Sequence, residues 1–181
     1  MLLDRLAVKR IHWVGESLGG DVGIQFANDY PDRIASLTLC STPYRYTRDM
    51  RATVRGWPEQ LRHMSVKEWY LHDTTLRFDP DKDDQQMIQW FADLVGGTAP
   101  DVLQAILRFL PDVDVSALCP KIKVPTLILH PGQSPIAPVE EALIEEAPVA
   151  AEAPVVAAVV EEAPVEAPGV TEDEQMPADA A

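Results

Sequence analysis

One stretch of sequence decides the fold: Ile11-His12-Trp13-Val14-Gly15-Glu16-Ser17-Leu18-Gly19-Gly20. The apolar run over residues 11–15 predicts a buried strand, and the glycines after it predict a sharp turn. Residues 17–30 then have helical periodicity, which Pro31 ends. Residues 34–40 are rich in Ile, Leu and Thr and predict a second strand. A strand, tight turn, helix and strand in close succession form a βαβ unit, which implies a parallel sheet.

The turn carries a serine between glycines, with the spacing Gly-x-Ser-x-Gly. A serine hydroxyl becomes an effective nucleophile when it is exposed, lies beside a base and faces donors for an oxyanion. A strand-to-helix turn exposes Ser17 above the sheet and directs the backbone amide of Leu18 at the forming oxyanion. We expect close backbone contact at Gly15 and Gly19, and tight contact of helix and sheet at Gly20. The alternative is a glycine-rich turn whose serine only caps the helix.

Residues 44–118 differ in character from the βαβ unit, because aromatic and charged side chains mix there at helical spacing. The helix candidates of this segment are a turn opened by the capping box Ser65–Glu68, residues 84–95 and residues 100–110. Residues 124–130 return to strand character before the turn signal Pro131-Gly132. The body of the chain is therefore predicted as strand, helix, strand, helical insertion and strand.

The charge of the chain is concentrated at its C-terminal end. The 181 residues include 29 acids and 15 bases, for a formal net charge of −14. Residues 139–181 hold 12 of these acids and no Lys or Arg, and within them Glu-Ala-Pro-Val recurs. Recurrent prolines among small and charged side chains oppose both helix and core formation. We predict a domain over residues 1–138 and a disordered acidic tail over 139–181, with a short helix at 139–146 as an alternative for its start.

The composition also limits the classes of binding partner and the cellular location that we expect. No clustered basic face is evident, so nucleic acid is not an expected partner. No apolar run reaches the length of a membrane span and no signal peptide is recognised, so no membrane partner is expected. Cys40 and Cys119 are predicted to be free thiols, and a cytoplasmic location is the expectation. The aspartates of residues 79–84 lack the glycine and distal Glu of a calcium loop, so we predict neither a metal nor a cofactor.

Two stretches closely resemble the α/β-hydrolase fold family: residues 11–20 and Phe26-Ala27-Asn28-Asp29-Tyr30-Pro31-Asp32-Arg33-Ile34-Ala35-Ser36-Leu37-Thr38-Leu39-Cys40. The nearest types are the single-domain ester, enol-lactone and carbon–carbon-bond hydrolases. Residues 122–130 resemble the late strand that precedes the family's acid loop. Residues 44–118 take the place of the family's helical lid. The resemblance implies a partial α/β-hydrolase fold, a parallel sheet with a helical lid, over roughly residues 1–138.

The resemblance also implies a serine hydrolase that transfers the acyl group of a small ester, lactone or related carbonyl substrate to Ser17. It makes the amide of Leu18 an oxyanion donor and Gly15, Gly19 and Gly20 the elbow. The aromatic side chains of the lid would line an acyl pocket or, as the alternative, form the core of the lid: Trp57, Trp69, Tyr70, Trp90 and Phe91.

The chain departs from the family pattern at the acid and the histidine, which follow the serine in chain order. Ser134 stands where the acid is expected, and no histidine follows His130. His63 and His72 fall in the lid, where surface or packing roles are expected. His12 begins the elbow strand and is expected to point into the packing of the sheet. The triad acid and base are therefore not identifiable from the sequence, and Glu140 and Glu141 are unsupported substitutes for the acid.

The early strands of the family also have no counterpart before Ile11. We therefore expect a chain truncated relative to the family at both ends: a fragment, or a chain that self-associates or pairs with another chain to cover apolar faces and edges. The second functional hypothesis is a catalytically incompetent hydrolase-fold scaffold whose acidic tail is an interaction arm. A third hypothesis, a binding protein that acts through its tail, rests on the repeats alone.

Overall fold

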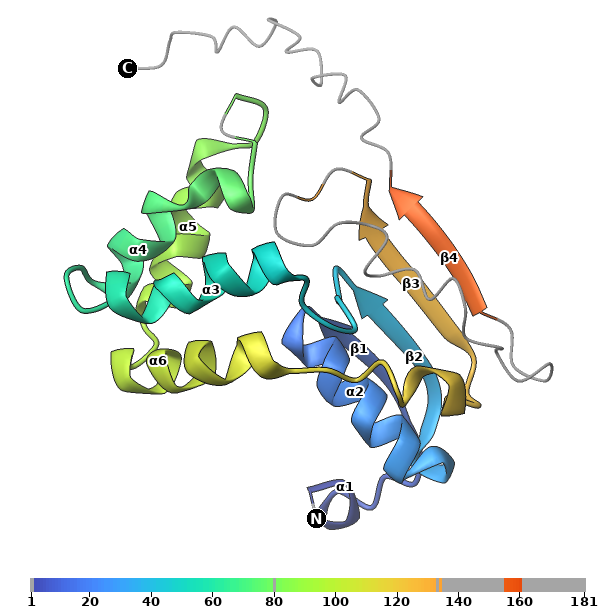
Figure 1. The fold of residues 1–181 in the computed structure, drawn as a ribbon. Helices are drawn as coiled ribbons and strands as arrows, with labels where there is room; N and C mark the ends of the chain where they lie inside the picture. The colour runs from blue at the N-terminus through green and yellow to red at the C-terminus, as the bar shows by residue number, and fades with distance from the viewer. Residues whose placement is uncertain (1, 80, 133, 135–154, 161–181) are drawn as a thin grey trace, which may run out of the picture.

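The computed structural model describes residues 2–79, 81–132, 134 and 155–160. In these ranges four strands form one parallel sheet in the order β1-β2-β3-β4 (Figure 1). The strands are β1 Ile11–Glu16, β2 Ile34–Cys40, β3 Thr126–Pro131 and β4 Val155–Val160. In register, Gly15 lies opposite Leu39 and Leu39 opposite Ile128. The parallel sheet predicted from the sequence is confirmed.

Helix α2, Leu18–Asp29, connects β1 to β2 and covers one face of the sheet. Ile24 of α2 is buried with Leu37 of β2 and Ile128 of β3. Close packing is possible because Gly23 leaves room for the indole of Trp13; a Cβ at Gly23 would overlap that ring. This core fixes the height of α2 above the sheet, and with it the position of the turn that precedes the helix.

Four helices form a separate layer, named here the helical layer, which the chain enters after β2 (Figure 1). They are α3 Arg48–Gln60, α4 Val66–His72, α5 Gln85–Gly96 and α6 Pro100–Phe109. Local signals start them: Thr47 caps α3, and both hydrogen bonds of the predicted capping box at Ser65 open α4. Asp84 caps α5, and Pro100 opens α6. A short helix α1, Leu2–Arg5, precedes the sheet.

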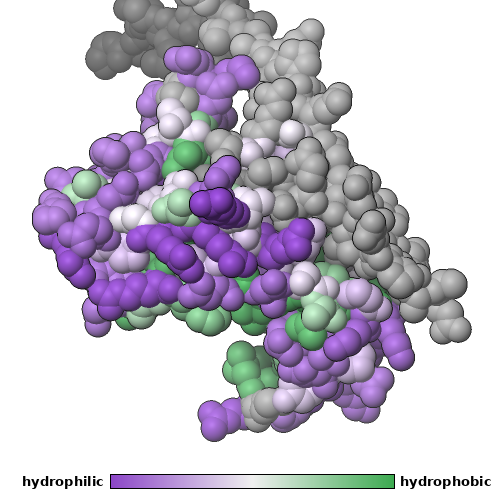
Figure 2. All heavy atoms as spheres, in the orientation of Figure 1, coloured by the Kyte–Doolittle hydropathy of each residue, from purple (hydrophilic) through white to green (hydrophobic). Residues whose placement is uncertain are grey.

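The sheet and the helical layer have separate apolar cores. Around Trp57 and Trp69, the helical layer buries its own cluster, whereas Ile34 and Leu37 belong to the cluster between the sheet and α2. Leu18 packs against both clusters. In the space-filling view, hydrophilic side chains dominate the outer face of the helical layer (Figure 2). Throughout the described ranges, every helix is too short or too polar for a membrane span.

Two details differ from the sequence predictions. His12 does not point into the packing: it is exposed, and its Nδ1 lies 2.7 Å from Ser36 Oγ. Side chains alternate along a strand, so His12 and Val14 lie on the face opposite α2, where Val14 is 70% exposed. Val155–Val160 forms β4 beside β3, where the sequence predicted no regular structure. This segment is a six-residue run of Val and Ala without proline, and valine favours strands. The rest of the predicted tail, the alternative helix at 139–146 included, lies outside the described residues.

Candidate active site

Ser17 occupies the turn between β1 and α2 in a strained conformation, with φ 48° and ψ −124°. A positive φ is uncommon for a residue with a side chain and persists only where the surroundings enforce it. Two backbone hydrogen bonds do so: the Ser17 amide donates to Cys40 O at 2.9 Å, and the Gly20 amide donates to Ser17 O at 2.8 Å. The turn is thereby tied to the end of β2 and to the first turn of α2.

The glycines of the turn differ in what they allow. A Cβ at Gly15 would overlap the backbone of Gly19 and Gly20, and a Cβ at Gly20 would overlap the side chain of Thr42. A Cβ at Gly19, in contrast, would meet open space. Gly19 therefore takes part in the predicted contact through its own backbone, which Gly15 approaches, and not through its missing side chain.

The hydroxyl of Ser17 does not cap helix α2. It makes no capping hydrogen bond to α2, so the alternative of a helix-capping serine has no support. Instead, the hydroxyls of Ser17 and Tyr46 share a hydrogen bond. Burial and the nearby Asp21 carboxylate raise the pKa of Tyr46 to about 12, against the opposing effect of that hydrogen bond. Tyr46 is therefore a neutral phenol at physiological pH. Sequence reasoning missed Tyr46, because nothing local in the sequence connects it with the turn.

A cavity of about 540 Å³ opens above Ser17, between the turn and the helical layer. Its apolar walls include Trp57 of α3, Tyr70 of α4 and Phe91 of α5. Four of the five predicted aromatic side chains line it, and Trp90, which is 61% exposed, does not. The same four side chains also pack in or against the core of the helical layer, so the core role predicted as the alternative is confirmed for them, and the acyl-pocket role stays a prediction. The cavity is of the size that binds small organic ligands.

Comparison with known proteins identifies the family. A family model described as alpha/beta hydrolase fold matches residues 1–105. The chain belongs to the α/β-hydrolase fold family. RutD of Variovorax paradoxus is 55% identical over 38 residues, which are 21% of this chain and 14% of RutD.

Solved structures of α/β hydrolases agree with this assignment. The enol-lactonase from Burkholderia xenovorans superposes with a TM-score of 0.72 at 22% identity, covering 87% of this chain and 60% of that one. A hydrolase from Pseudomonas aeruginosa gives 0.71 at 24% identity, covering 87% and 59%. At these identities the likeness shows the fold alone. This α/β-hydrolase chain thus spans about three fifths of the length of these two structures and a smaller part of RutD.

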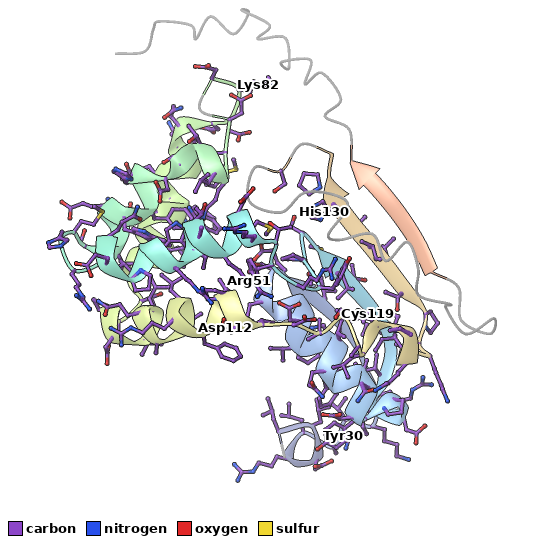
Figure 3. The ribbon with its side chains drawn as sticks, in the orientation of Figure 1. Tyr30, Arg51, Lys82, Asp112, Cys119 and His130 are labelled. Atoms are coloured by element: carbon purple, nitrogen blue, oxygen red, sulfur yellow. The ribbon has the colours of Figure 1, made fainter. Side chains whose placement is uncertain are left out.

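The four histidines of this α/β-hydrolase chain belong to the described residues, and each has surroundings other than the cavity lining. His63 and His72 are exposed on the helical layer, beside Glu59 and Asp73 respectively. His130 is buried at the end of β3 (Figure 3). None of these three, nor His12, lines the cavity.

Ser134, which stands at the acid position of the family pattern, does line the cavity with Ser17. A serine side chain carries no charge, so Ser134 cannot supply the negative charge of a triad acid. Glu140 and Glu141 lie outside the described residues. No group of three or more His, Cys, Asp or Glu that could hold a metal ion occurs within the described ranges.

Three ionisable side chains lie near the turn or line the cavity: Glu16, Asp21 and Arg77. Glu16 and Arg77 line the cavity; burial raises the pKa of the Glu16 carboxyl, which the Arg77 charge partly offsets. Asp21 lies one helical turn after Ser17 and is only 3% exposed, and neither of its carboxylate oxygens has a hydrogen-bond partner among the residues that the structure describes. Burial raises its pKa to about 7. The sequence pattern signals neither Asp21 nor Arg77, since both depend on tertiary contacts.

Proposed function

We propose that this α/β hydrolase is a serine hydrolase that acts on a small carboxylic ester or lactone, with Ser17 as the nucleophile. One observation carries the proposal: Ser17 is held at a positive φ, its hydroxyl makes no capping hydrogen bond to α2, and it lines a largely apolar cavity of about 540 Å³. Storing backbone strain at a turn that presents a serine is typical of nucleophile elbows. In this proposal the helical layer is the lid and its aromatic side chains contact the acyl group.

The chemistry follows from the groups around the turn. Ser17 Oγ attacks the carbonyl carbon, and the carbonyl oxygen acquires negative charge. The backbone amide of Leu18, at the N-terminus of α2, donates to that oxygen. The neutral phenol of Tyr46, beside Ser17, supplies its O–H as a second donor to the same oxygen. Collapse of the intermediate breaks the bond to the alcohol oxygen, which takes up the proton that Ser17 gives up, and leaves the acyl group on Ser17; water then adds to the acyl carbon, returns a proton to Ser17 Oγ and releases the acid.

A second candidate, a catalytically incompetent scaffold of the same fold, is favoured by a different observation. Acyl transfer needs a base for the Ser17 proton, and no histidine of the described residues lines the cavity.

A cytoplasmic location and self-association remain predictions. The side chain of Val14, which is 70% exposed on the face of β1 opposite α2, is a place where a partner could cover the sheet.

Labelling of the full chain with a fluorophosphonate tests the first candidate. Mass spectrometry should locate the adduct on Ser17, and Ser17→Ala should abolish it. Ser41→Ala is the matched control, because Ser41 lines the same cavity and also has a positive φ, 47°; labelling should persist in this variant. Folded protein that stays unlabelled would rule out the nucleophile. Labelling without turnover of a short-chain nitrophenyl ester would support the scaffold candidate.

A further inference from the structure

Among the described residues, Arg77 is the cationic group that lines the cavity above Ser17. It directly follows the 3-10 turn Thr74–Leu76, and its guanidinium carbon lies 4.5 Å from the ring centroid of Tyr70. The corresponding distances to Trp69 and Trp57 are 5.2 Å and 5.5 Å. Three aromatic rings therefore hold the guanidinium against the cavity, within the range of favourable cation–π contact.

The hydrogen-bonding capacity of Arg77 is mostly unused. A guanidinium has five N–H donors. Within the described residues one hydrogen bond of Arg77 is found, from Nη1 to Asp73 O at 3.3 Å. Asp73 and Glu16 act on Arg77 through their charge, but neither forms an ion pair with it. Burial lowers the pKa of Arg77, so the charge is held in a partly desolvated site. A desolvated cation with free donors is an anion-binding group.

We propose that Arg77 binds a carboxylate of the substrate, so that the cavity accepts a compound with an ionised acid at one end and the reactive ester or lactone at the other. The ester end of this inference rests on the proposed function; the carboxylate end rests on Arg77 alone. Planar guanidinium groups match carboxylates with two parallel hydrogen bonds, and the mostly apolar cavity that Arg77 and Ser17 both line suits a short hydrocarbon chain. A dicarboxylic monoester is the simplest compound of this kind.

The alternative role for Arg77 is purely structural, as a cation that braces the aromatic rings of the helical layer. The two roles differ in one measurable respect. A brace stabilises the fold without regard to ligand charge, whereas an anchor makes an anionic ligand bind more tightly than its neutral counterpart. The preference for acid over neutral ester therefore separates them.

The experiment compares monomethyl adipate with dimethyl adipate by calorimetry on the full chain carrying Ser17→Ala, so that neither ester is hydrolysed. We expect the monoanion to bind about ten- to a hundredfold more tightly, as a charge-assisted hydrogen bond allows. Arg77→Gln in the same background should bring the ratio close to one, and Arg77→Lys should leave it intermediate. Arg108→Gln, at an exposed arginine of α6 outside the cavity, should retain the full ratio.

The outcomes are distinguishable even if an Arg77 variant fails to fold, which circular dichroism would reveal. Equal binding of the two esters by the Ser17→Ala protein, or binding of neither, overturns the proposal without any Arg77 variant. An unchanged ratio in a folded Arg77→Gln variant also overturns it. None of these results depends on the reactivity of Ser17, which the fluorophosphonate experiment measures separately.

Discussion

Gly15 lies against the carbonyl group of Gly19 so closely that a Cβ at Gly15 would overlap it. We predict that Gly15→Ala lowers the free energy of unfolding by about 1–3 kcal/mol, because the backbone of the turn must shift to admit the methyl group. Urea denaturation measures the loss. Gly19→Ala is the matched control: its Cβ meets open space in the first turn of α2, and alanine favours helix, so stability should hold or rise. Equal losses in the two variants would contradict the close contact.

Tyr46→Phe removes the hydroxyl that shares a hydrogen bond with Ser17 and keeps the buried ring. If the phenol donates to the oxyanion, the rate of fluorophosphonate labelling or ester turnover should fall by roughly a hundredfold. Thermal unfolding should change little. Tyr44→Phe, at a partly buried tyrosine outside the cavity lining, serves as the control and should leave the rate within a few fold. An unchanged rate for Tyr46→Phe would restrict Tyr46 to packing.

Asp21 makes stability depend on pH. Its pKa is about 7 in the folded chain, against an ordinary value of 3.8. Between these values the folded protein retains a proton that the unfolded chain has released. The free energy of unfolding therefore falls as the pH rises through this range, by at most about 1.4 kcal/mol per pH unit, and levels off above pH 7.

Asp21→Asn should remove this contribution, so that the variant gains on the parent protein as the pH rises from 5 to 8. Urea denaturation at several pH values measures the difference. Asp81→Asn, at an exposed loop carboxylate, is the control and should run parallel to the parent. A parallel curve for Asp21→Asn would show that Asp21 is ionised or partnered in solution.

Trp57 and Trp90 separate cavity-lining from exposed aromatic side chains. Trp57 is 5% exposed and lines the cavity, whereas Trp90 is 61% exposed. Trp57→Ala should lower the free energy of unfolding by about 3–5 kcal/mol. Trp90→Ala should change it by about 0.5 kcal/mol or less, as is usual at the surface. A large loss at Trp90 would indicate that a further part of the chain or a partner covers it.

The elements that the sequence predicts correctly are those with local causes. Periodicity and Pro31 define α2, and the capping box at Ser65 opens α4 where the spacing places it. The turn at Ser17 is predictable because its glycines are adjacent in sequence to the strand and helix that need them.

The features that the sequence does not reveal have non-local causes. Tyr46 reaches Ser17 across 29 positions of the chain, and Arg77 faces the cavity only because three rings of the helical layer hold it there. The prediction that His12 points into the packing of the sheet is wrong, since periodicity alone does not say which face of an apolar strand a helix covers.

Leu18, next to Ser17, is partly buried and packs against both apolar cores of the described chain. Its side chain therefore connects the two cores. A change in the helical layer that makes room for a larger ligand also alters the packing of Leu18, whose amide faces the reacting carbonyl in the proposed mechanism. The size of the ligand that the cavity accepts and the position of the Leu18 amide at the turn are then coupled through one leucine. Changes in the helical layer that leave Leu18 in place are the ones that can alter specificity at little cost to the rate.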